Sequence, residues 1–198
     1  MTNNLAAYFF TGISIAAISS PISARIGDSK SNLESRLLKA NGIVLREDSL
    51  LENRQTGMPY LEYEEYYPKP YDVRLYFKPA DGRRPKPLDG WELHVLYVKG
   101  NSVLEVYKKT SDITEFEIKH LLVLQAGKSF WQESTPEDLP DGKFSALGFD
   151  LARDDGQLRA KKLGSRAIMI FRTQTDEFFH TAQQKDQTQL APESIEGF

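Results

Sequence analysis

The sequence predicts an α+β fold: an antiparallel sheet of about five to seven strands with one or two helices packed on one face. Three observations predict it. Apolar and polar residues alternate on both sides of a short turn within 91–108, a capped helical pattern follows at 114–126, and a further apolar run lies at 167–171. Antiparallel strands joined by tight turns, with helices gathered on one face, are typical of this class. We expect a single domain over residues 25–173.

The composition excludes several functional classes. The chain of 198 residues has 25 Lys and Arg against 28 Asp and Glu, so its net charge is −3. Nucleic-acid-binding domains are usually basic, so we expect no nucleic-acid partner. The absence of Cys excludes disulfides, thiolate metal sites and a cysteine nucleophile. An apolar content of 40% is enough to build a hydrophobic core.

The N-terminal segment has the composition of a targeting sequence. Residues 1–24 contain no charged side chain, and 5–18 is an apolar run followed by small residues up to Ala24. This run has the length of the apolar region of a signal peptide and is short for a bilayer span of about 20 residues. We expect 1–24 to be a signal peptide, with export to the periplasm or extracellular space and no stable membrane span after cleavage. A buried N-terminal helix and an uncleaved anchor are the alternatives.

The next elements are a helix and a brief strand. Ser31 and Glu34 have the spacing of a capping box, so a helix is expected over 31–40, ended by Asn41-Gly42. Residues 43–45 are expected to form a short strand. Three further stretches are assigned by composition, namely two aromatic strands and a loop rich in Gly and Pro: 60–67, 71–78 and 81–90.

The clearest unit is a hairpin followed by a helix. Strands 91–98 and 103–108 flank a turn at Gly100-Asn101, and a second capping box starts a helix at 114–126. The spacing of apolar residues in these elements and in the final strand places nine side chains in one core: Trp91, Leu93, Val95, Tyr97, Ile118, Leu121, Leu122, Ile168 and Ile170.

A second hairpin and a final strand complete the predicted sheet. Residues 144–153 and 157–163 flank a turn at 154–156, and 167–171 has the continuous apolar run of a buried strand. The last segment, 174–198, consists largely of Gln, Thr, Asp, Glu and Ser. We expect it to be a disordered polar tail.

No local motif of a catalytic or cofactor site is present. The chain lacks the serine-hydrolase sequence G-x-S-x-G and the phosphate-binding sequences G-x-x-x-x-G-K-[ST] and G-x-G-x-x-G. His94 and His120 come from adjacent predicted elements and could meet Glu92 or Glu117, but two histidines in this pattern are weak evidence for a metal site. We therefore expect no cofactor, no metal site and no catalytic residue.

The first functional hypothesis is an exported, non-catalytic α+β domain that binds a protein or another envelope component. Tyr and Arg give large contact areas with a polar end and are frequent at binding hot spots. The expected surface combines tyrosines with a cationic loop: Tyr63, Tyr66, Tyr67, Tyr71, Arg83, Arg84 and Lys86. The competing interpretation is that some of these rings, such as Tyr63 and Tyr71, pack against the sheet.

The second hypothesis is an envelope hydrolase, of the glycan-acting kind, that uses dispersed carboxylates. Glu62, Glu64 and Glu65 lie among tyrosines, whose rings can stack on sugar faces. Two carboxyl groups roughly 5–10 Å apart in a deep cleft would favour this hypothesis. A sheet face closed by the helix at 114–126, without a cleft, would favour the first.

Overall fold

The centre of the fold is one antiparallel sheet. The structure is a computed structural model that describes residues 25–45, 55–79 and 90–190. The strands, in the order β1-β2-β3-β4-β8-β7-β6-β5 across the sheet, have these bounds: β1 Ile43–Leu45, β2 Tyr71–Pro79, β3 Gly90–Val98, β4 Asn101–Lys109, β5 Trp131–Glu133, β6 Leu151–Arg153, β7 Leu158–Lys162 and β8 Ala167–Arg172. The α+β class and the antiparallel sheet are thus confirmed. The sheet has eight strands in the described residues, and three of them, β1, β5 and β6, are only three residues long.

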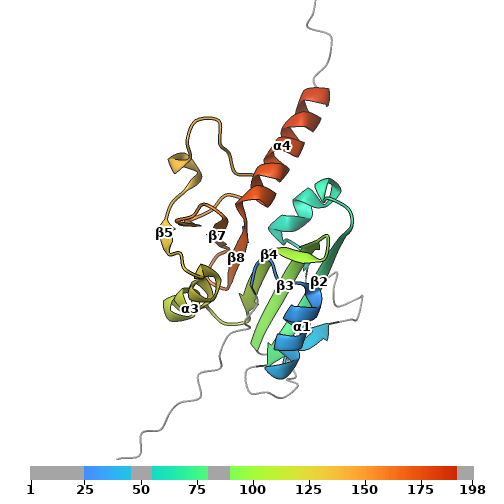
Figure 1. Ribbon diagram of the computed structural model, residues 1–198, viewed down its shortest axis with the longest axis vertical. Coiled ribbons are helices and arrows are strands. Elements are labelled where there is room, and N and C mark those ends of the chain that lie inside the picture. The colour runs from blue at the N-terminus through green and yellow to red at the C-terminus, as the bar shows by residue number, and fades with distance from the viewer. Residues whose placement is uncertain (1–24, 46–54, 80–89, 191–198) are drawn as a thin grey trace, which may run out of the picture.

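Within the described residues, three α-helices and two 3₁₀-helices accompany this sheet (Figure 1). They are the α-helices α1 (Lys30–Lys39), α3 (Glu115–Ala126) and α4 (Thr173–Leu190), and the 3₁₀-helices η1 (Pro59–Tyr66) and η2 (Pro136–Asp138). None of the helices among the described residues is long and apolar enough to cross a bilayer.

Helices α1 and α3 cover one face of the sheet, as predicted. Leu33 and Leu37 of α1 join all nine predicted core residues in a single cluster, which we call the first core. The capping box at the start of α3 forms as expected, because the Thr114 hydroxyl accepts from the Glu117 N–H while the Glu117 carboxylate accepts from the Thr114 N–H. The predicted capping box of Ser31 and Glu34 is wrong: α1 begins at Lys30, and its cap is Ser29, whose hydroxyl accepts from the Asn32 N–H.

A second core lies on the opposite face, under η1 and the first half of α4. It contains side chains of β3, β4 and β8, such as Leu96, Val106 and Phe171, together with tyrosines of η1 and Phe179 of α4. The sheet is therefore covered on both faces, which explains why all but the last residue of β3 are buried.

The segment 60–67 is not the predicted strand. It forms η1, in which Tyr60 and Tyr63 are buried, and the next residue, Tyr67, is buried with them. Spacings of three and four residues are helical, so these rings gather on one side of η1 and fill the second core. The aromatic residues that suggested a strand are thus the buried side chains of a short helix.

The segment after 173 corrects a second prediction. Residues 173–190 form α4, which contacts β8 and η1 and then projects away from the sheet (Figure 1). Two of its side chains, Asp176 and Phe179, are fully buried. Part of the expected disordered tail is therefore a helix with an anchored first half. The expected signal peptide, the cationic loop with Arg83, Arg84 and Lys86, and residues 191–198 lie outside the described residues.

The remaining predicted strands form, except that 144–150, expected in the second hairpin, is not a strand and β6 covers only Leu151–Arg153. The turn of the β3–β4 hairpin is Lys99-Gly100, one residue earlier than expected, and both residues have positive φ angles, 51° and 80°. Positive φ at both central residues is the geometry of a type I′ turn, which matches the twist of a hairpin. Strands β6 and β7 form the second hairpin, while β8 pairs with both β4 and β7 near the middle of the sheet.

Candidate binding site

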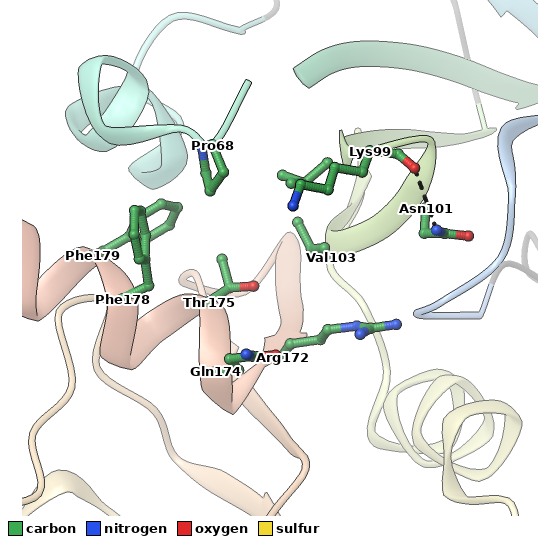
Figure 2. A pocket seen from close by; sticks show the side chains of 10 residues that line it. Pro68, Lys99, Asn101, Val103, Arg172, Gln174, Thr175, Phe178 and Phe179 are labelled. Carbon is green, nitrogen blue, oxygen red and sulfur yellow. Dashed lines mark hydrogen bonds between the residues drawn. The ribbon is translucent and has the colours of Figure 1, made fainter. Parts of the chain in front are cut away.

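A hollow with a volume of about 340 Å³ lies where the β3–β4 turn, the segment before β2 and the first turns of α4 meet. We call it the α4 pocket (Figure 2). Its apolar lining consists of Pro68, Val98, Val103, Phe178 and Phe179, and its polar lining of Lys99, Asn101, Arg172, Gln174 and Thr175. An apolar hollow with a few polar groups at its rim is the usual form of a ligand site.

The apolar wall of the α4 pocket follows from the packing of α4. Phe179 is fully buried and stacks on Tyr63, with 4.9 Å between ring centroids. Phe178 immediately precedes Phe179 in the helix, so its ring points in another direction and remains 42% exposed at the pocket. The buried ring therefore holds the exposed ring in place.

Two cations, Lys99 and Arg172, border this apolar wall. The side chains of Lys99 and Arg172 make no hydrogen bond or ion pair with any residue in the described part of the chain. Figure 2 shows the Lys99 amine extending over the hollow above Val103, whereas the Arg172 guanidinium points away from the phenylalanines. A guanidinium has five N–H donors, and those of the half-buried Arg172 form no bond with a described residue.

Arg172 also borders a second, smaller hollow. This hollow has a volume of about 230 Å³ and shares Arg172 and Gln174 with the α4 pocket. A Cβ atom on Gly27 would lie 3.0 Å from Arg172 Nη2, so the guanidinium rests against the Gly27 backbone. Because Arg172 lines both hollows, a ligand that extends from the α4 pocket into the smaller hollow would pass its side chain.

Two of the four predicted surface tyrosines are core residues. Tyr63 is 6% exposed and Tyr67 is 4% exposed. The Tyr63 hydroxyl donates to the Ala146 carbonyl at 2.9 Å, and the Tyr67 hydroxyl donates to the Tyr60 carbonyl. These rings hold η1 against the sheet, so they cannot form the binding surface that the sequence suggested.

The other two predicted tyrosines are half-buried at the margin of η1. A hydrogen bond with Asp186 of α4 is the main cause that raises the pKa of Tyr66 to about 12. The Tyr71 hydroxyl donates to Glu64 at 3.2 Å. Both therefore contact acidic side chains, and the structure does not describe the predicted cationic partners in the loop 80–89.

The glutamates of the hydrolase hypothesis do meet in one place. Glu62, Glu64 and Glu65 line a hollow of about 430 Å³ together with Lys69 and Tyr71. All three carboxylates are exposed. A glycosidase acid must retain its proton near neutral pH, which requires burial or a close like charge in a site shielded from water. The exposed glutamates lack that shielding.

His94 belongs to a buried network on the second face. The Tyr60 hydroxyl lies 2.7 Å from His94 Nδ1, and Glu92 Oε1 lies 2.8 Å from His94 Nε2. Burial and the nearby Glu92 raise the pKa of Tyr60, so its hydroxyl keeps its proton and does not act as a base. This network joins η1 to β3. His120 lies on α3, across the sheet, and no three His, Asp or Glu side chains among the described residues gather as a metal site would require.

Comparison of the chain with protein-family models, with curated proteins and with solved structures gave no match. The candidate site therefore depends on geometry alone. Sequence analysis missed its main residues, Lys99, Arg172 and Phe178. One pattern could have indicated them: Phe178-Phe179 is an adjacent aromatic pair in an otherwise polar segment, which a disordered tail does not need.

Proposed function

We propose that this chain is an exported, non-catalytic domain that binds a protein or another envelope component through the α4 pocket. The observation that carries the proposal is the pair of cations, Lys99 and Arg172, which have no side-chain partner among the described residues and lie beside an apolar wall. The ligand that fits this arrangement presents a carboxylate or another anion attached to an apolar group. The uncharged segment 1–24 supports the part of the proposal that concerns export.

The charges and the apolar wall would act together. A hydrogen bond between a cation and a carboxylate contributes about 1.5–3 kcal/mol, more than one between neutral groups. Covering the exposed part of Phe178 adds roughly 25 cal/mol for each Å² removed from water. A ligand with only one of these features would therefore bind more weakly.

A catalytic role has less support. The exposed glutamates near η1 are open to water, and the buried carboxylates Glu92, Glu105 and Asp176 are bound into networks within the fold. A hydrolase would need at least one carboxyl group that is both shielded and able to reach a substrate.

The test uses 3-phenylpropanoate, which joins a phenyl ring to a carboxylate, and its neutral amide as the matched probe. Amide resonances of Asn101 and Thr175 in the full chain are followed during titration. We expect shifts with the carboxylate and at least tenfold weaker binding of the amide, since a lost charged hydrogen bond contributes about 1.5 kcal/mol or more. Lys99→Gln and Arg172→Gln should weaken binding, whereas Lys185→Gln, an exposed change further along α4, should not.

Two outcomes would contradict the proposal. If the carboxylate and the amide bind equally, the cations do not select the ligand. The second outcome is that incubation with the protein releases reducing ends from purified peptidoglycan and that the double variant Glu64→Gln, Glu65→Gln abolishes this release. The hydrolase hypothesis would then replace the binding proposal.

A further inference from the structure

Helix α3 is apolar on two opposite sides. Its inner side chains, Ile118, Leu121 and Leu122, belong to the first core. Phe116 and Val123 lie seven residues apart on the outer side and are 63% and 68% exposed. A surface helix of a globular protein normally has a polar outer face, so this helix exposes more apolar surface than its packing explains.

The outer side of α3 also carries positive charge. At about 100° per residue, Phe116, Lys119, His120 and Val123 share an arc of about 100° opposite the first core, which we call the α3 outer face. Lys119 is exposed and makes no ion pair with a described residue.

The acidic side chains of α3 lie at the borders of this arc, and lysines neutralise them. Glu115 pairs with Lys162 at 3.1 Å and Glu117 pairs with Lys109 at 2.9 Å. The α3 outer face thus combines two apolar side chains with one cation, Lys119, and has no carboxylate of its own.

The segment after α3 adds one more exposed ring and one more lysine, beside the carboxylate of Asp154, which accepts from the Phe130 N–H at 3.1 Å. Phe130 is 61% exposed, and the exposed Lys128 precedes it by two residues. The indole N–H of Trp131 donates to the Leu122 carbonyl at 2.8 Å, which holds this segment beside the end of α3.

We propose that the α3 outer face binds the surface of an anionic lipid bilayer. Phe116 and Val123 would enter the region between headgroups and acyl chains, while Lys119 would contact the headgroup phosphates. Protruding apolar side chains with adjacent lysines are typical of helices that lie in a membrane interface. The inner side of α3 is fixed in the first core, so the outer residues are presented on a rigid support. This proposal uses none of the residues of the α4 pocket.

The experiment uses the absence of cysteine in the chain. Val123→Cys, and separately Glu137→Cys on the exposed η2, receive one environment-sensitive fluorophore in the full chain. Vesicles of phosphatidylcholine with or without phosphatidylglycerol are then added. We expect a blue shift at position 123 only, and only with phosphatidylglycerol. Any attachment through residues 1–24 would be common to both labelled proteins, so the difference between the two positions reports on α3.

Variants of the Val123→Cys protein test the named contacts. Phe116→Ser should weaken vesicle binding about tenfold or more, and Lys119→Gln about fivefold. Leu38→Ser is the matched control, because Leu38 is also exposed but lies on α1. Equal shifts at both positions, or equal shifts with neutral vesicles, would overturn the proposal. A shift that appears without vesicles as the protein concentration rises would overturn it in favour of a second copy of the chain.

Discussion

At the residue scale, Glu105 is a carboxyl group enclosed in the first face of the sheet. It accepts hydrogen bonds from the Tyr107 hydroxyl at 2.7 Å and from Gln125 Nε2 at 2.9 Å. Its second oxygen, Oε1, is buried and has no hydrogen-bond partner among the described residues. Loss of hydration on burial raises the pKa of Glu105 to about 7, although these hydrogen bonds act in the opposite direction.

This pKa predicts how stability depends on pH. Between the ordinary carboxyl pKa of 4.5 and the folded value of about 7, the folded chain binds more protons at Glu105 than the unfolded chain. The free energy of unfolding should therefore fall as pH rises, with no effect well below 4.5 and the full effect, at most about 3 kcal/mol, above 7. Thermal unfolding between pH 5 and 8 should show a smaller decrease for Glu105→Gln than for the unchanged chain. If stability falls equally with pH in both proteins, the titration of Glu105 is not the cause. Glu62→Gln, a change at the surface, is the control.

A second prediction at this scale separates the neighbouring tyrosines. Tyr67→Ala empties part of the second core and should destabilise the chain by about 3–5 kcal/mol, as for other buried aromatic residues. Tyr66→Ala, which removes a half-buried ring at the margin, should cost about 1 kcal/mol. Urea unfolding measures both. If the two variants lose similar free energies of unfolding, Tyr67 contributes no more to the core than Tyr66 does, and the prediction is wrong.

At the element scale, two residues of α3 test which side of the helix faces the first core. Leu121→Ala should cost about 2–5 kcal/mol, because Leu121 is buried. Val123→Ala, two residues later, should change stability by no more than about 0.5 kcal/mol, because Val123 faces outward. A loss below roughly 0.5 kcal/mol for Leu121→Ala in chemical unfolding would mean that the helix packs through another side.

Helix α4 is anchored by a buried ion pair. Asp176 accepts from Arg159 Nη1 at 2.5 Å and from the backbone N–H groups of Ala146 and Leu147. Asp176→Asn would replace the nearer and fully buried charged partner of the Arg159 guanidinium with a neutral amide, and we expect a loss of about 3–5 kcal/mol. Hydrogen exchange at Ala146 and Leu147 should accelerate with it.

The matched control for α4 is Glu177→Gln at the next position. Glu177 lies 3.9 Å from Arg159 and also pairs with the exposed Lys143, so its replacement should change stability by less than about 1 kcal/mol. If both variants lose the same free energy of unfolding, the negative charge of the first turns of α4 stabilises the helix, and the buried pair has no special role.

At the scale of the whole molecule, the first described residues join β4 to α3. Ser102 exchanges backbone hydrogen bonds with Gly27 and Asp28, and the Ile26 N–H donates to Gln125 Oε1 at 2.9 Å. Cleavage after Ala24 would keep all of these bonds, whereas removal of five further residues would break them. We predict that protein recovered from outside the cytoplasm begins near Arg25 on N-terminal sequencing. An intact Met1 in a soluble cytosolic pool would contradict export.

The sequence by itself determined the first face of the molecule. The alternation in β3, the capping box of α3 and the apolar run of β8 are local patterns, and each fixes its element without knowledge of the rest of the chain. The apolar spacing in these elements then identifies the side chains that meet, which is why all nine predicted residues fall in the first core.

Only the tertiary structure decided the second face and the candidate site. Tyr63 packs on Phe179, a residue more than a hundred positions away, so neither the helical form of η1 nor the order of α4 can be read from a local window. In isolation, 60–67 has the aromatic content of a strand and 174–190 has the polarity of a tail. Burial of the rings against the sheet outweighs these local preferences, because the apolar surface removed from water exists only once both segments meet. The α4 pocket is a product of that meeting, since Lys99, Arg172 and Phe178 come from three elements that no sequence spacing relates.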